Sequence, residues 1–341
     1  MGALRILYLG TKSGTCLDRA RAYERLGHQV LHIDPRALLP QTAWVDRVTW
    51  RLGGQYWAPL LRSALVKTLA GRRFDMCHVD CGEWITPATV TILKAHAKKV
   101  INYCIDDPTG PRDGARFHAY REALPYYDLV VVMRPQNVDE AKALGARQVM
   151  RVYMSADEVS HAPRNMTEEQ RRHWETKVLF LGTWMPERGP FLLQLIEQGV
   201  PLSIRGAHWQ KAPEWKKLQA HWVGGPVSGD EYAYAIQSAQ VNLGLLSKGN
   251  RDAHTTRSME VPSLGGVLCA ERTDEHVVLY EDKKEAVFWS TAEECAKACM
   301  ALLADDEARA NLAQAGRTRF LSSGYTNQAV LEQVLHRSVS K

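Results

Sequence analysis

Four polar side chains near residue 257 have the types and the spacing to bind a phosphorylated ligand. Arg257 and Glu260 are three positions apart, so on a helix they share a face. Thr255 and Thr256 precede them and are good N-caps, and the start of a capped helix presents backbone N–H groups to an anion. A guanidinium suits phosphate oxygens, and a carboxylate can accept two hydroxyl hydrogen bonds. This segment offers the groups that a nucleoside-diphosphate sugar requires.

Each of these residues also has a simpler interpretation. Glu260 could be a surface glutamate, although both of its neighbours are apolar, and Arg257 could be exposed or form a salt bridge with Glu260. Thr255 and Thr256 would cap the helix whatever the function. His254, beside them, could donate to a phosphate or lie next to a transferred sugar, but a single loop histidine often has no such role.

A second loop follows a buried strand and could complete the site. Gly182 and Thr183 stand where a glycine lets the backbone approach a ligand, and Arg188 adds a second cation. An ordinary strand–helix turn would use the same residue types. We therefore count this loop among the candidate phosphate-binding segments, with an ordinary strand–helix turn as the alternative.

Two adjacent carboxylates could act as a catalytic base. Asp106 and Asp107 follow an apolar strand and precede Pro108, so they point towards the ligand-binding edge of a sheet. Either could take a proton from an acceptor hydroxyl. Asp-Pro also favours a turn or a helix cap, which is the structural alternative.

The cysteines do not follow a zinc-binding pattern. Cys77 and Cys81 are four apart, but no second pair with suitable spacing follows them. Cys295 and Cys299 would share one helical face and pack in a core. Seven cysteines are an odd number in a chain too long to need disulfides, which favours reduced thiols in a cytoplasmic protein. We expect no metal and no other cofactor.

Strands and helices alternate along the whole chain, which predicts parallel α/β layers. The predicted strands are 6–9, 29–33, 76–79, 100–105, 128–133, 148–153, 178–181, 202–204, 241–246, 267–270 and 286–289. The predicted helices are 17–26, 87–96, 191–198, 230–239, 292–303, 307–315 and 327–336, and segment 44–69 is partly basic and helical after Gln55. Ser290 and Glu293 form a possible capping box for helix 292–303, and Gly316 is the expected end of helix 307–315.

This order predicts two doubly wound domains. Residues 1–155 form the first and residues 177–323 the second, with a polar linker at 156–176 and a C-terminal helix within 324–341 that could pack back on the first domain. Two such halves leave a cleft between them, and ligands bind beyond the carboxyl ends of the strands. The candidate residues above all lie in loops at such ends or directly after them.

Composition sets wider bounds. The chain has 341 residues, of which 45% are hydrophobic and 24% charged, as expected for a soluble globular protein. No apolar run reaches the roughly 18 residues that span a membrane, and the first apolar segment is too short for a secretory signal. The net charge of +5 is mild. It favours anionic substrates or a peripheral position on an acidic membrane, and it is too weak to argue for nucleic acid.

Several segments together resemble a known family. RSMEVPSLGGVLCAERTDE and the following KKEAVFWSTAEECAKACMALLADDEARANLAQAGRTRFLSSGYT resemble the C-terminal signature of the CgeB-like (spore maturation protein) glycosyltransferases, a GT-B group distantly similar to family 4, the glycosyl transferases group 1. VLFLGTWMPERGPF resembles the first strand and loop of the donor domain, and NYCIDDPTG resembles the Asp-Asp-Pro segment of the first domain. The resemblance covers residues 100–335.

The resemblance implies two Rossmann-like domains of the GT-B fold, with the nucleotide-sugar donor bound mostly by the second, the acceptor mostly by the first, and no metal. It implies that Glu260 binds the ribose and that Pro226 and Val227 hold the nucleobase through backbone groups. Many relatives carry a second glutamate seven positions before Glu260, where this chain has Ala253. The contact of that glutamate with the donor sugar is therefore in question here.

We thus expect a metal-independent glycosyltransferase with a glycan, lipid-linked, protein or small-molecule acceptor. Retaining chemistry would need no protein base, because the leaving phosphate can take the proton, whereas inverting chemistry would use Asp106 or Asp107. A nucleotide-sugar epimerase of the same fold and a non-catalytic protein that binds a glycan or nucleotide are the alternatives.

Overall fold

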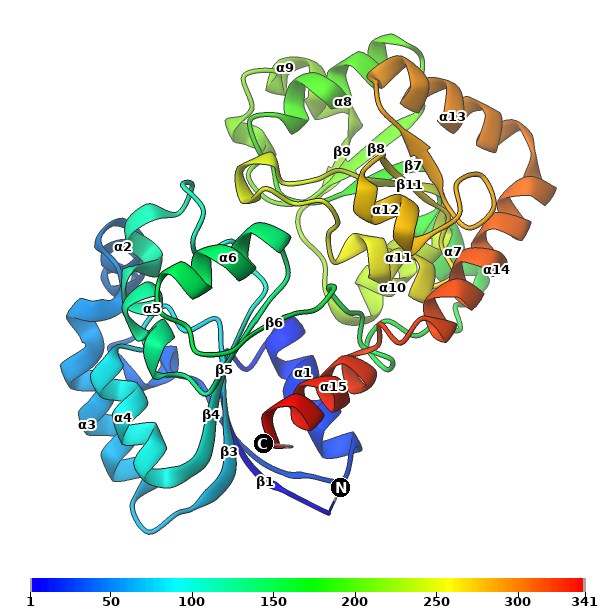
Figure 1. Cartoon of the computed structure of the whole chain (residues 1–341). Helices are drawn as coiled ribbons and strands as arrows, with labels where there is room; N and C mark the ends of the chain where they lie inside the picture. The colour runs from blue at the N-terminus through cyan, green and yellow to red at the C-terminus, as the bar shows by residue number, and fades with distance from the viewer. Residues whose placement is uncertain (1, 340–341) are drawn as a thin grey trace. The chain divides into compact units, whose positions relative to one another are not determined.

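The structure, a computed structural model, describes residues 2–339, which form two compact units (Figure 1). Unit 1 contains the described residues up to Tyr153, the short segment Gly249–Arg251, and the described residues from Asn327 onward. Unit 2 contains Met154–Lys248 and Asp252–Thr326. Each unit holds one six-stranded sheet of parallel strands flanked by helices, so the predicted α/β class is confirmed.

The sheet of unit 1 has the strand order β2-β1-β3-β4-β5-β6, with every neighbouring pair parallel. The chain runs from β1 outward to β2 and then returns to place β3 on the other side of β1. Ligands of open α/β sheets bind at such a switch point, beyond the carboxyl ends of the strands. The strands are β1 Arg5–Leu9, β2 Gln29–Ile33, β3 Phe74–Asp80, β4 Ala97–Cys104, β5 Leu129–Val132 and β6 Val149–Arg151.

Helices cover both faces of this sheet. On one face α1 packs against α15, which comes from the far end of the described chain (Figure 1). On the other face α3, α4 and α5 pack in sequence. The helices of unit 1 are α1 Gly14–Arg25, α2 Ala43–Leu52, α3 Ala58–Leu69, α4 Pro87–His96, α5 His118–Ala123, α6 Pro135–Ala143 and α15 Asn327–Val339.

The sheet of unit 2 repeats this topology, with the order β12-β11-β10-β7-β8-β9 and parallel pairing throughout. The chain runs outward from β7 to β9 and then returns to place β10 beside β7. The switch point of unit 2 therefore lies between β7 and β10. The strands are β7 Thr176–Leu181, β8 Leu202–Arg205, β9 Trp222–Gly224, β10 Ala239–Gly244, β11 Leu268–Glu271 and β12 Val287–Trp289.

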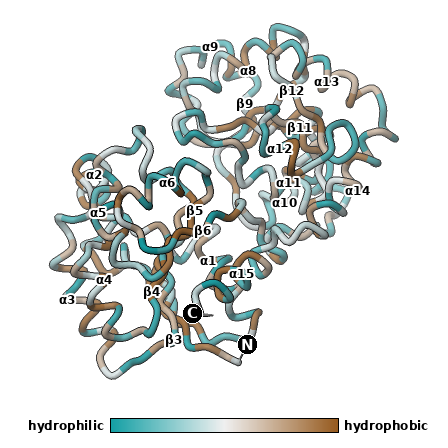
Figure 2. The backbone as a smooth tube through the Cα atoms, viewed as in Figure 1, coloured by the Kyte–Doolittle hydropathy of each residue, from teal (hydrophilic) through white to brown (hydrophobic). Residues whose placement is uncertain are grey.

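The helices of unit 2 also pack in two groups. Helix α8 packs on α9 and α13, whereas α10 packs on α7 and α11 on α14. Figure 2 shows hydrophobic segments along the strands, and the strand side chains form a buried core in each unit. The helices are α7 Glu168–Trp174, α8 Arg188–Glu197, α9 Trp215–Leu218, α10 Gly229–Ser238, α11 Arg257–Ser263, α12 Asp274–Leu279, α13 Ala292–Ala304 and α14 Asp306–Ser322.

Three local predictions were wrong. Segment 44–69 is helical before Gln55 as well as after it, because α2 precedes the short 3-10 turn Gly54–Trp57. The cap of α13 is Thr291, whose hydroxyl accepts from the Glu294 N–H at 3.2 Å, so the predicted cap is displaced by one residue. Helix α14 continues through Gly316 to Ser322. A Cβ at Gly316 would lie 2.4 Å from the Glu285 carbonyl oxygen, so this glycine serves close packing and does not end the helix.

Candidate functional site

Arg257 and Glu260 form an ion pair on the short helix α11, as their spacing allows. The guanidinium Nη1 donates to Glu260 Oε2, and the arginine Nε donates to the Leu181 carbonyl at 3.2 Å. Leu181 is the last residue of β7, so the pair lies at the switch point of unit 2. The Glu260 side chain is 4% exposed and the Arg257 side chain 28% exposed. The cation thus reaches solvent while its carboxylate is buried.

Two side chains that sequence reasoning missed hold Glu260 in place. The Tyr232 hydroxyl donates to Glu260 Oε2 at 2.5 Å, and the Tyr232 ring lies 4.8 Å from the Arg257 guanidinium carbon. His161 Nδ1 accepts from the Asp157 N–H at 2.9 Å, so its proton is on Nε2, which faces Glu260 Oε1 at 3.5 Å. These partners come from segments far along the chain, which leave no local pattern.

The electrostatics keep the Arg257–Glu260 pair ionised. Burial would raise the pKa of the Glu260 carboxyl, but the Arg257 charge and the hydrogen bonds outweigh burial and lower that pKa. Burial, reinforced by the Glu260 charge, raises the pKa of Tyr232 well above its usual value, so Tyr232 is a neutral donor. Among residues 2–339, Arg257 Nη2 has no hydrogen-bond partner, so its N–H groups can bind an anionic ligand.

The loop that begins with Gly182 and Thr183 lies at the same switch point. The Arg188 guanidinium is buried beneath it and donates to the Thr183 carbonyl at 2.8 Å and to the carbonyls of Leu245 and Leu246 at 3.3 Å. Arg188 therefore ties the loop after β7 to the loop after β10. These carbonyl contacts give Arg188 a role in positioning the loops, which differs from the expected second cation for the phosphate.

The threonine caps predicted before α11 are absent. Thr256 occupies the N-cap position, but its hydroxyl accepts from the Arg257 guanidinium at 3.4 Å and from no backbone N–H of the helix. Instead the Ser258 hydroxyl accepts from the Thr255 N–H at 3.1 Å. Within the described part of the chain, the N–H groups of Thr256 and Arg257 have no backbone or side-chain acceptor, so both are available to an anion.

His254 does not have the open nitrogen that catalysis requires. Its ring is buried, Nε2 accepts from the Met154 N–H at 2.9 Å, and Nδ1 is hydrogen-bonded to Glu275. With both nitrogens occupied, the histidine holds the loop before α11 against the segment that enters unit 2. The predicted catalytic or phosphate-binding role is therefore corrected to a positioning role.

Pro226 and Val227 lie in the loop between β9 and α10, at the carboxyl end of the edge strand of the sheet. Pro226 is exposed and Val227 is half-buried. Their backbone groups lie two strands away from Leu181 across the sheet, which is a distance that a nucleoside can span along the strand ends.

Asp107 and Asp106 have different environments in unit 1. Asp107 is buried and accepts from Arg251 Nε and Nη2, each at 2.7 Å, and from Asn137 at 2.7 Å. A carboxylate with these donors cannot act as a base, so the catalytic assignment of Asp107 is corrected to a structural ion pair. Asp106 keeps a side chain that is 34% exposed, 3.5 Å from Arg116.

Asp106 lines a cavity of about 190 Å³ at the switch point of unit 1. The walls come from the ends of β1, β3 and β4 and include Gly10, Cys81, Glu83, Trp84 and Arg116. Arg116 Nε donates to Glu83 at 2.6 Å, so a cation and two carboxylates meet in the cavity wall. This is the arrangement that could bind a hydroxyl-bearing ligand beside a potential base.

Asp80, which lines this cavity, belongs to a buried polar network that sequence reasoning missed. Asp80, the last residue of β3, accepts from Arg19 Nε at 2.8 Å and from the Tyr8 hydroxyl, and lies 4.0 Å from His78. Burial lowers the pKa of His78 to about 3, so that ring is neutral. Burial would raise the pKa of Asp80, but the Arg19 charge lowers it, so the ion pair persists. An aspartate directly after a buried strand was the available sequence signal.

Comparisons with known proteins agree with this geometry. Residues 188–336 match the family model described as glycosyl transferase-like. The match covers less than half of the chain and includes most of unit 2. Among solved structures, sucrose-phosphate synthase from Thermosynechococcus elongatus has a TM-score of 0.69 and 12% identity, with 98% of each chain covered. No curated protein matches the chain.

Two further structures share the architecture. HepE from Anabaena, in complex with UDP-glucose, has a TM-score of 0.66 and 12% identity over 98% of this chain and 99% of HepE. The N-terminal domain of Candida albicans trehalose-6-phosphate phosphatase has a TM-score of 0.69 and 10% identity over 98% of this chain and 96% of that domain. At these identities the likeness concerns the fold. The chain has the GT-B fold, and within residues 2–339 no helix is long and apolar enough to cross a membrane.

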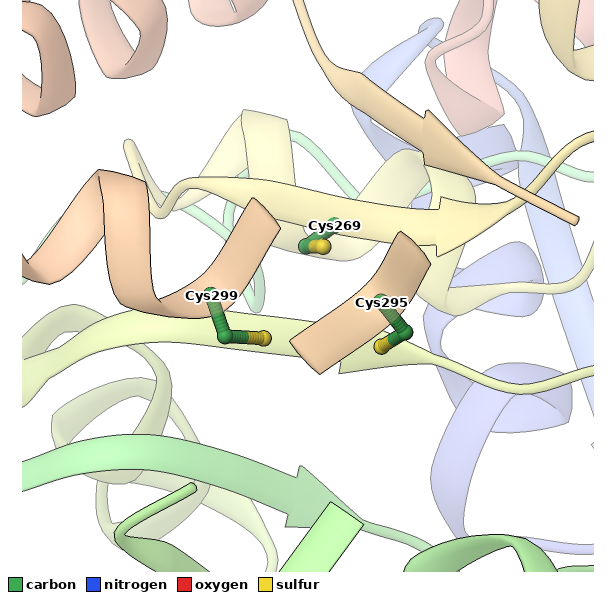
Figure 3. Close-up of side chains that lie close together, drawn as sticks. All are labelled: Cys269, Cys295 and Cys299. Carbon is green, nitrogen blue, oxygen red and sulfur yellow. The ribbon is translucent and has the colours of Figure 1, made fainter. Parts of the chain in front are cut away.

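The region that matches the family model also contains a cluster of three cysteines. Cys269 on β11 and Cys295 and Cys299 on α13 place their Sγ atoms within 4.8 Å of one another (Figure 3). All three are buried, which confirms the predicted core position of Cys295 and Cys299. Hydrogen bonding of the Cys269 thiol to the Cys295 and Cys299 sulfurs, together with burial, raises the pKa of Cys269, so it stays protonated. Zinc usually takes four ligands, and in the described chain this group has three.

Proposed function

We propose that the chain is a glycosyltransferase that transfers a sugar from a nucleoside-diphosphate sugar to an acceptor hydroxyl. The observation that carries the proposal is the partly exposed Arg257, held by the buried Glu260, at the β7–β10 switch point in a region similar to the glycosyl transferase-like family. Ligands bind at switch points in such sheets, and a guanidinium there matches a diphosphate. HepE, which has the same fold, was solved with UDP-glucose.

In this proposal the diphosphate binds the free Nη2 of Arg257 and the N–H groups of Thr255, Thr256 and Arg257, with the backbone of Gly182 and Thr183 close by. The Thr255 N–H would have to leave the Ser258 hydroxyl, whereas the other two N–H groups have no protein acceptor to give up among the described residues. Negative charge grows on the diphosphate as the sugar leaves, and a fixed cation stabilises that charge. We propose that the reaction needs no metal for this reason.

Glu260 would bind the ribose, and Pro226 and Val227 the nucleobase. The Glu260 carboxylate already accepts from Tyr232 and Arg257, so binding two ribose hydroxyls requires that one of these donors turns away. Glu260 would then serve twice, first to hold the guanidinium in the empty site and then to hold the donor. This dual role makes Glu260 the most informative position to change.

The acceptor would bind at the β1–β3 switch point of unit 1, where Asp106 lines the cavity. If the reaction inverts the sugar, Asp106 is the proposed base, because its carboxylate is partly exposed whereas Asp107 is committed to Arg251. If the reaction retains the configuration, the leaving phosphate takes the proton. We further propose that the protein belongs to the CgeB-like group and acts in the cytoplasm in polysaccharide biosynthesis.

Thermal unfolding in the presence of UDP, GDP, CDP, TDP or ADP tests the donor site. At least one nucleotide should raise the melting temperature, since a hundredfold excess over Kd adds about 2.7 kcal/mol to folded-state stability. Arg257→Ala and Glu260→Gln should abolish the rise. Arg171→Ala, which removes an exposed arginine from α7, should leave it intact. No rise with any nucleotide on folded wild-type protein would refute the donor assignment.

A labelled nucleotide-sugar then separates the reaction classes. Transfer to added acceptors, or slow hydrolysis to free sugar, supports the transferase. Release of an isomerised nucleotide-sugar would show the epimerase alternative, and saturable binding without turnover would show a non-catalytic binding protein. Asp106→Asn should stop transfer by an inverting enzyme and leave the thermal response to the nucleotide unchanged.

A further inference from the structure

Large apolar side chains are exposed along one continuous stretch of unit 1. The stretch covers α2, the 3-10 turn Gly54–Trp57 and α3, and we call it the α2–α3 surface. Elsewhere in residues 2–339 such side chains are exposed singly or in pairs. On this surface six are at least half exposed, namely Trp44 at 65%, Trp50 at 58%, Leu52 at 53%, Tyr56 at 62%, Leu60 at 52% and Val66 at 50%.

These side chains are additional to the face that packs the core. Helix α2 buries Val45 and Thr49, and α3 buries Leu61, Leu65 and Leu69. Each helix therefore already has a buried side that docks it on unit 1. The exposed apolar residues lie outside these buried sides and are interspersed with cations along the sequence. A concentration of exposed large apolar side chains marks an interaction site in soluble domains.

The charge of the same stretch is strongly positive. Residues 43–73 contain one carboxylate, Asp46, which is paired with Arg36. Outside this stretch the chain has 37 basic and 37 acidic side chains, so the whole net charge of +5 is carried here. None of the six cations forms an ion pair with another described residue. They are Arg47, Arg51, Arg62, Lys67, Arg72 and Arg73.

We propose that the α2–α3 surface binds an anionic lipid bilayer. Tryptophan and tyrosine favour the headgroup level of a membrane, and arginines on an interfacial helix are drawn to anionic headgroups. The aliphatic members Leu52, Leu60 and Val66 distinguish a bilayer from single-stranded RNA, because RNA binding uses aromatic rings on which bases stack. A uniform excess of one charge sign also suits a surface that is uniformly negative.

The α2–α3 surface adjoins the cavity of unit 1. The Arg116 guanidinium lies 5.0 Å from the centre of the Trp50 ring and donates to Glu83 in the cavity wall. The indole N–H of Trp84, another wall residue, donates to Thr49 of α2 at 3.1 Å. Binding to a bilayer goes beyond the proposed function. A membrane-borne acceptor is a corollary that rests on the proposed function, because the cavity would then open beside the lipid surface.

Vesicle flotation with the full-length protein tests the proposal. The vesicles are made of phosphatidylcholine alone or with about 30% phosphatidylglycerol as the anionic lipid. We expect the protein to float with the anionic vesicles and to stay behind with the neutral ones. Arg47→Gln together with Arg51→Gln should lower the partition coefficient roughly 30-fold, since each cation near an anionic surface contributes about fivefold.

Two more variants keep the test sharp. Trp44→Ser with Tyr56→Ser and Leu60→Ser should lower partitioning at least about tenfold, and added salt should remove what remains. Arg171→Gln with Arg172→Gln makes the same charge change on exposed residues of α7 and should leave flotation unchanged. Melting temperatures within a few degrees of wild type show that each variant is folded.

Equal flotation with both vesicle types, or no effect of either α2–α3 variant, would overturn the proposal. So would binding of single-stranded RNA, measured by fluorescence anisotropy, without binding to vesicles. The flotation samples contain no nucleotide, so this result is independent of the donor site. If the protein shows a normal nucleotide-induced thermal shift but does not float with vesicles, only the membrane proposal is refuted. If it floats with anionic vesicles but shows no thermal shift with any nucleotide, only the glycosyltransferase proposal is refuted.

Discussion

Each of the two switch points of this molecule holds a carboxylate, an arginine, a tyrosine and a histidine, but the arginines differ in exposure. In unit 1, Asp80 is surrounded by Arg19, Tyr8 and His78, and the Asp80 and Arg19 side chains are 2% and 4% exposed. In unit 2 the carboxylate of Glu260 has an arginine, a tyrosine and a histidine as partners, and its arginine is 28% exposed.

This difference in exposure separates an ion pair that supports the fold from one that can also bind a ligand. A closed ion pair has all its hydrogen bonds inside the protein, so it fixes the ends of β1 and β3 but offers nothing to a ligand. The arginine of unit 2 is also paired with a buried carboxylate, but its side chain is partly exposed to solvent. A fixed, partly exposed cation can bind charge that develops during a reaction without reorganising. The following changes test this contrast, from the largest expected effect to the smallest.

Asp80→Asn should be the most destabilising change. It leaves the buried Arg19 guanidinium without its counterion, which costs about 3–5 kcal/mol when one partner of a buried pair is lost. Urea denaturation measures the free energy of unfolding of unit 1. Glu260→Gln should cost less, because Arg257 can be hydrated. Equal losses of stability in Asp80→Asn and Glu260→Gln would contradict the contrast between the buried pair of unit 1 and the partly exposed pair of unit 2.

Arg251→Gln should destabilise unit 1 by about 2 kcal/mol, at the low end for truncating a buried charge pair, because Asn137 still donates to Asp107. The change also has a pH signature. Hydrogen bonding by Arg251 is the largest cause that lowers the pKa of Glu140 from 4.5 to about 2. A carboxyl group whose pKa is lower in the folded state stabilises the fold at any pH above its pKa in the unfolded chain. That stabilisation is lost as the pH falls from about 5 towards 2.

Melting temperatures of wild type and Arg251→Gln across that pH window measure the effect. The wild-type protein should lose more stability on acidification than the variant does. The Glu140 side chain is 36% exposed, so solvent screens the difference and added salt should narrow it. Parallel pH profiles for the two proteins would show that the Arg251–Glu140 contact contributes no pH-dependent stability.

Gly206→Ala should disturb the switch point of unit 2. The backbone φ at Gly206 is +143°, and an added Cβ would lie 2.1 Å from the Gly182 carbonyl oxygen. Overpacking of this kind costs about 1–3 kcal/mol, and it should also displace the loop that begins with Gly182 and weaken nucleotide binding. Gly2→Ala in unit 1, where an added Cβ would have no atom within 4 Å, is the control. A normal thermal response to nucleotide in Gly206→Ala would exclude this loop from the donor site.

Thr291→Ala should have the smallest effect, about 1 kcal/mol, because it removes the hydroxyl that caps α13. Thr42→Ala, at the N-cap of α2 in unit 1, is the counterpart, since the Thr42 side chain makes no capping hydrogen bond. Thermal denaturation of both variants should show a loss only for Thr291→Ala. Equal losses would mean that the hydroxyl of Thr291 contributes little beyond its backbone conformation.

The sequence predicts local features well because local features depend on neighbours in the chain. Helix α4 begins and ends at the predicted residues, and Pro87 explains its start because proline favours the first helical position. The shared face of Arg257 and Glu260 follows from helical spacing and is confirmed by their ion pair. Each of these two predictions depends on a segment of fewer than a dozen consecutive residues.

Contacts between distant segments could not be predicted in this way. Asp107 meets Arg251 from 144 positions away, and Glu260 meets Tyr232 from 28 positions away. An aspartate before a proline has the same local pattern whether it faces an arginine or a substrate. The functional status of such residues depends on which donors fold against them, and this is why Asp107 and His254 changed roles once the fold was known.

Helix α15 has a consequence for how the protein is made. It covers a face of the unit 1 sheet beside α1, with Leu331 and Leu335 buried and the Ser338 hydroxyl 3.7 Å from the Met76 sulfur. Ribosomes synthesise β1–β6 before unit 2 and α15 after it. A nascent chain thus carries a sheet with an uncovered hydrophobic face while well over a hundred further residues are translated. Such a chain depends on late closure or on chaperones, and a fragment that stops at Tyr153 should aggregate where the full chain folds.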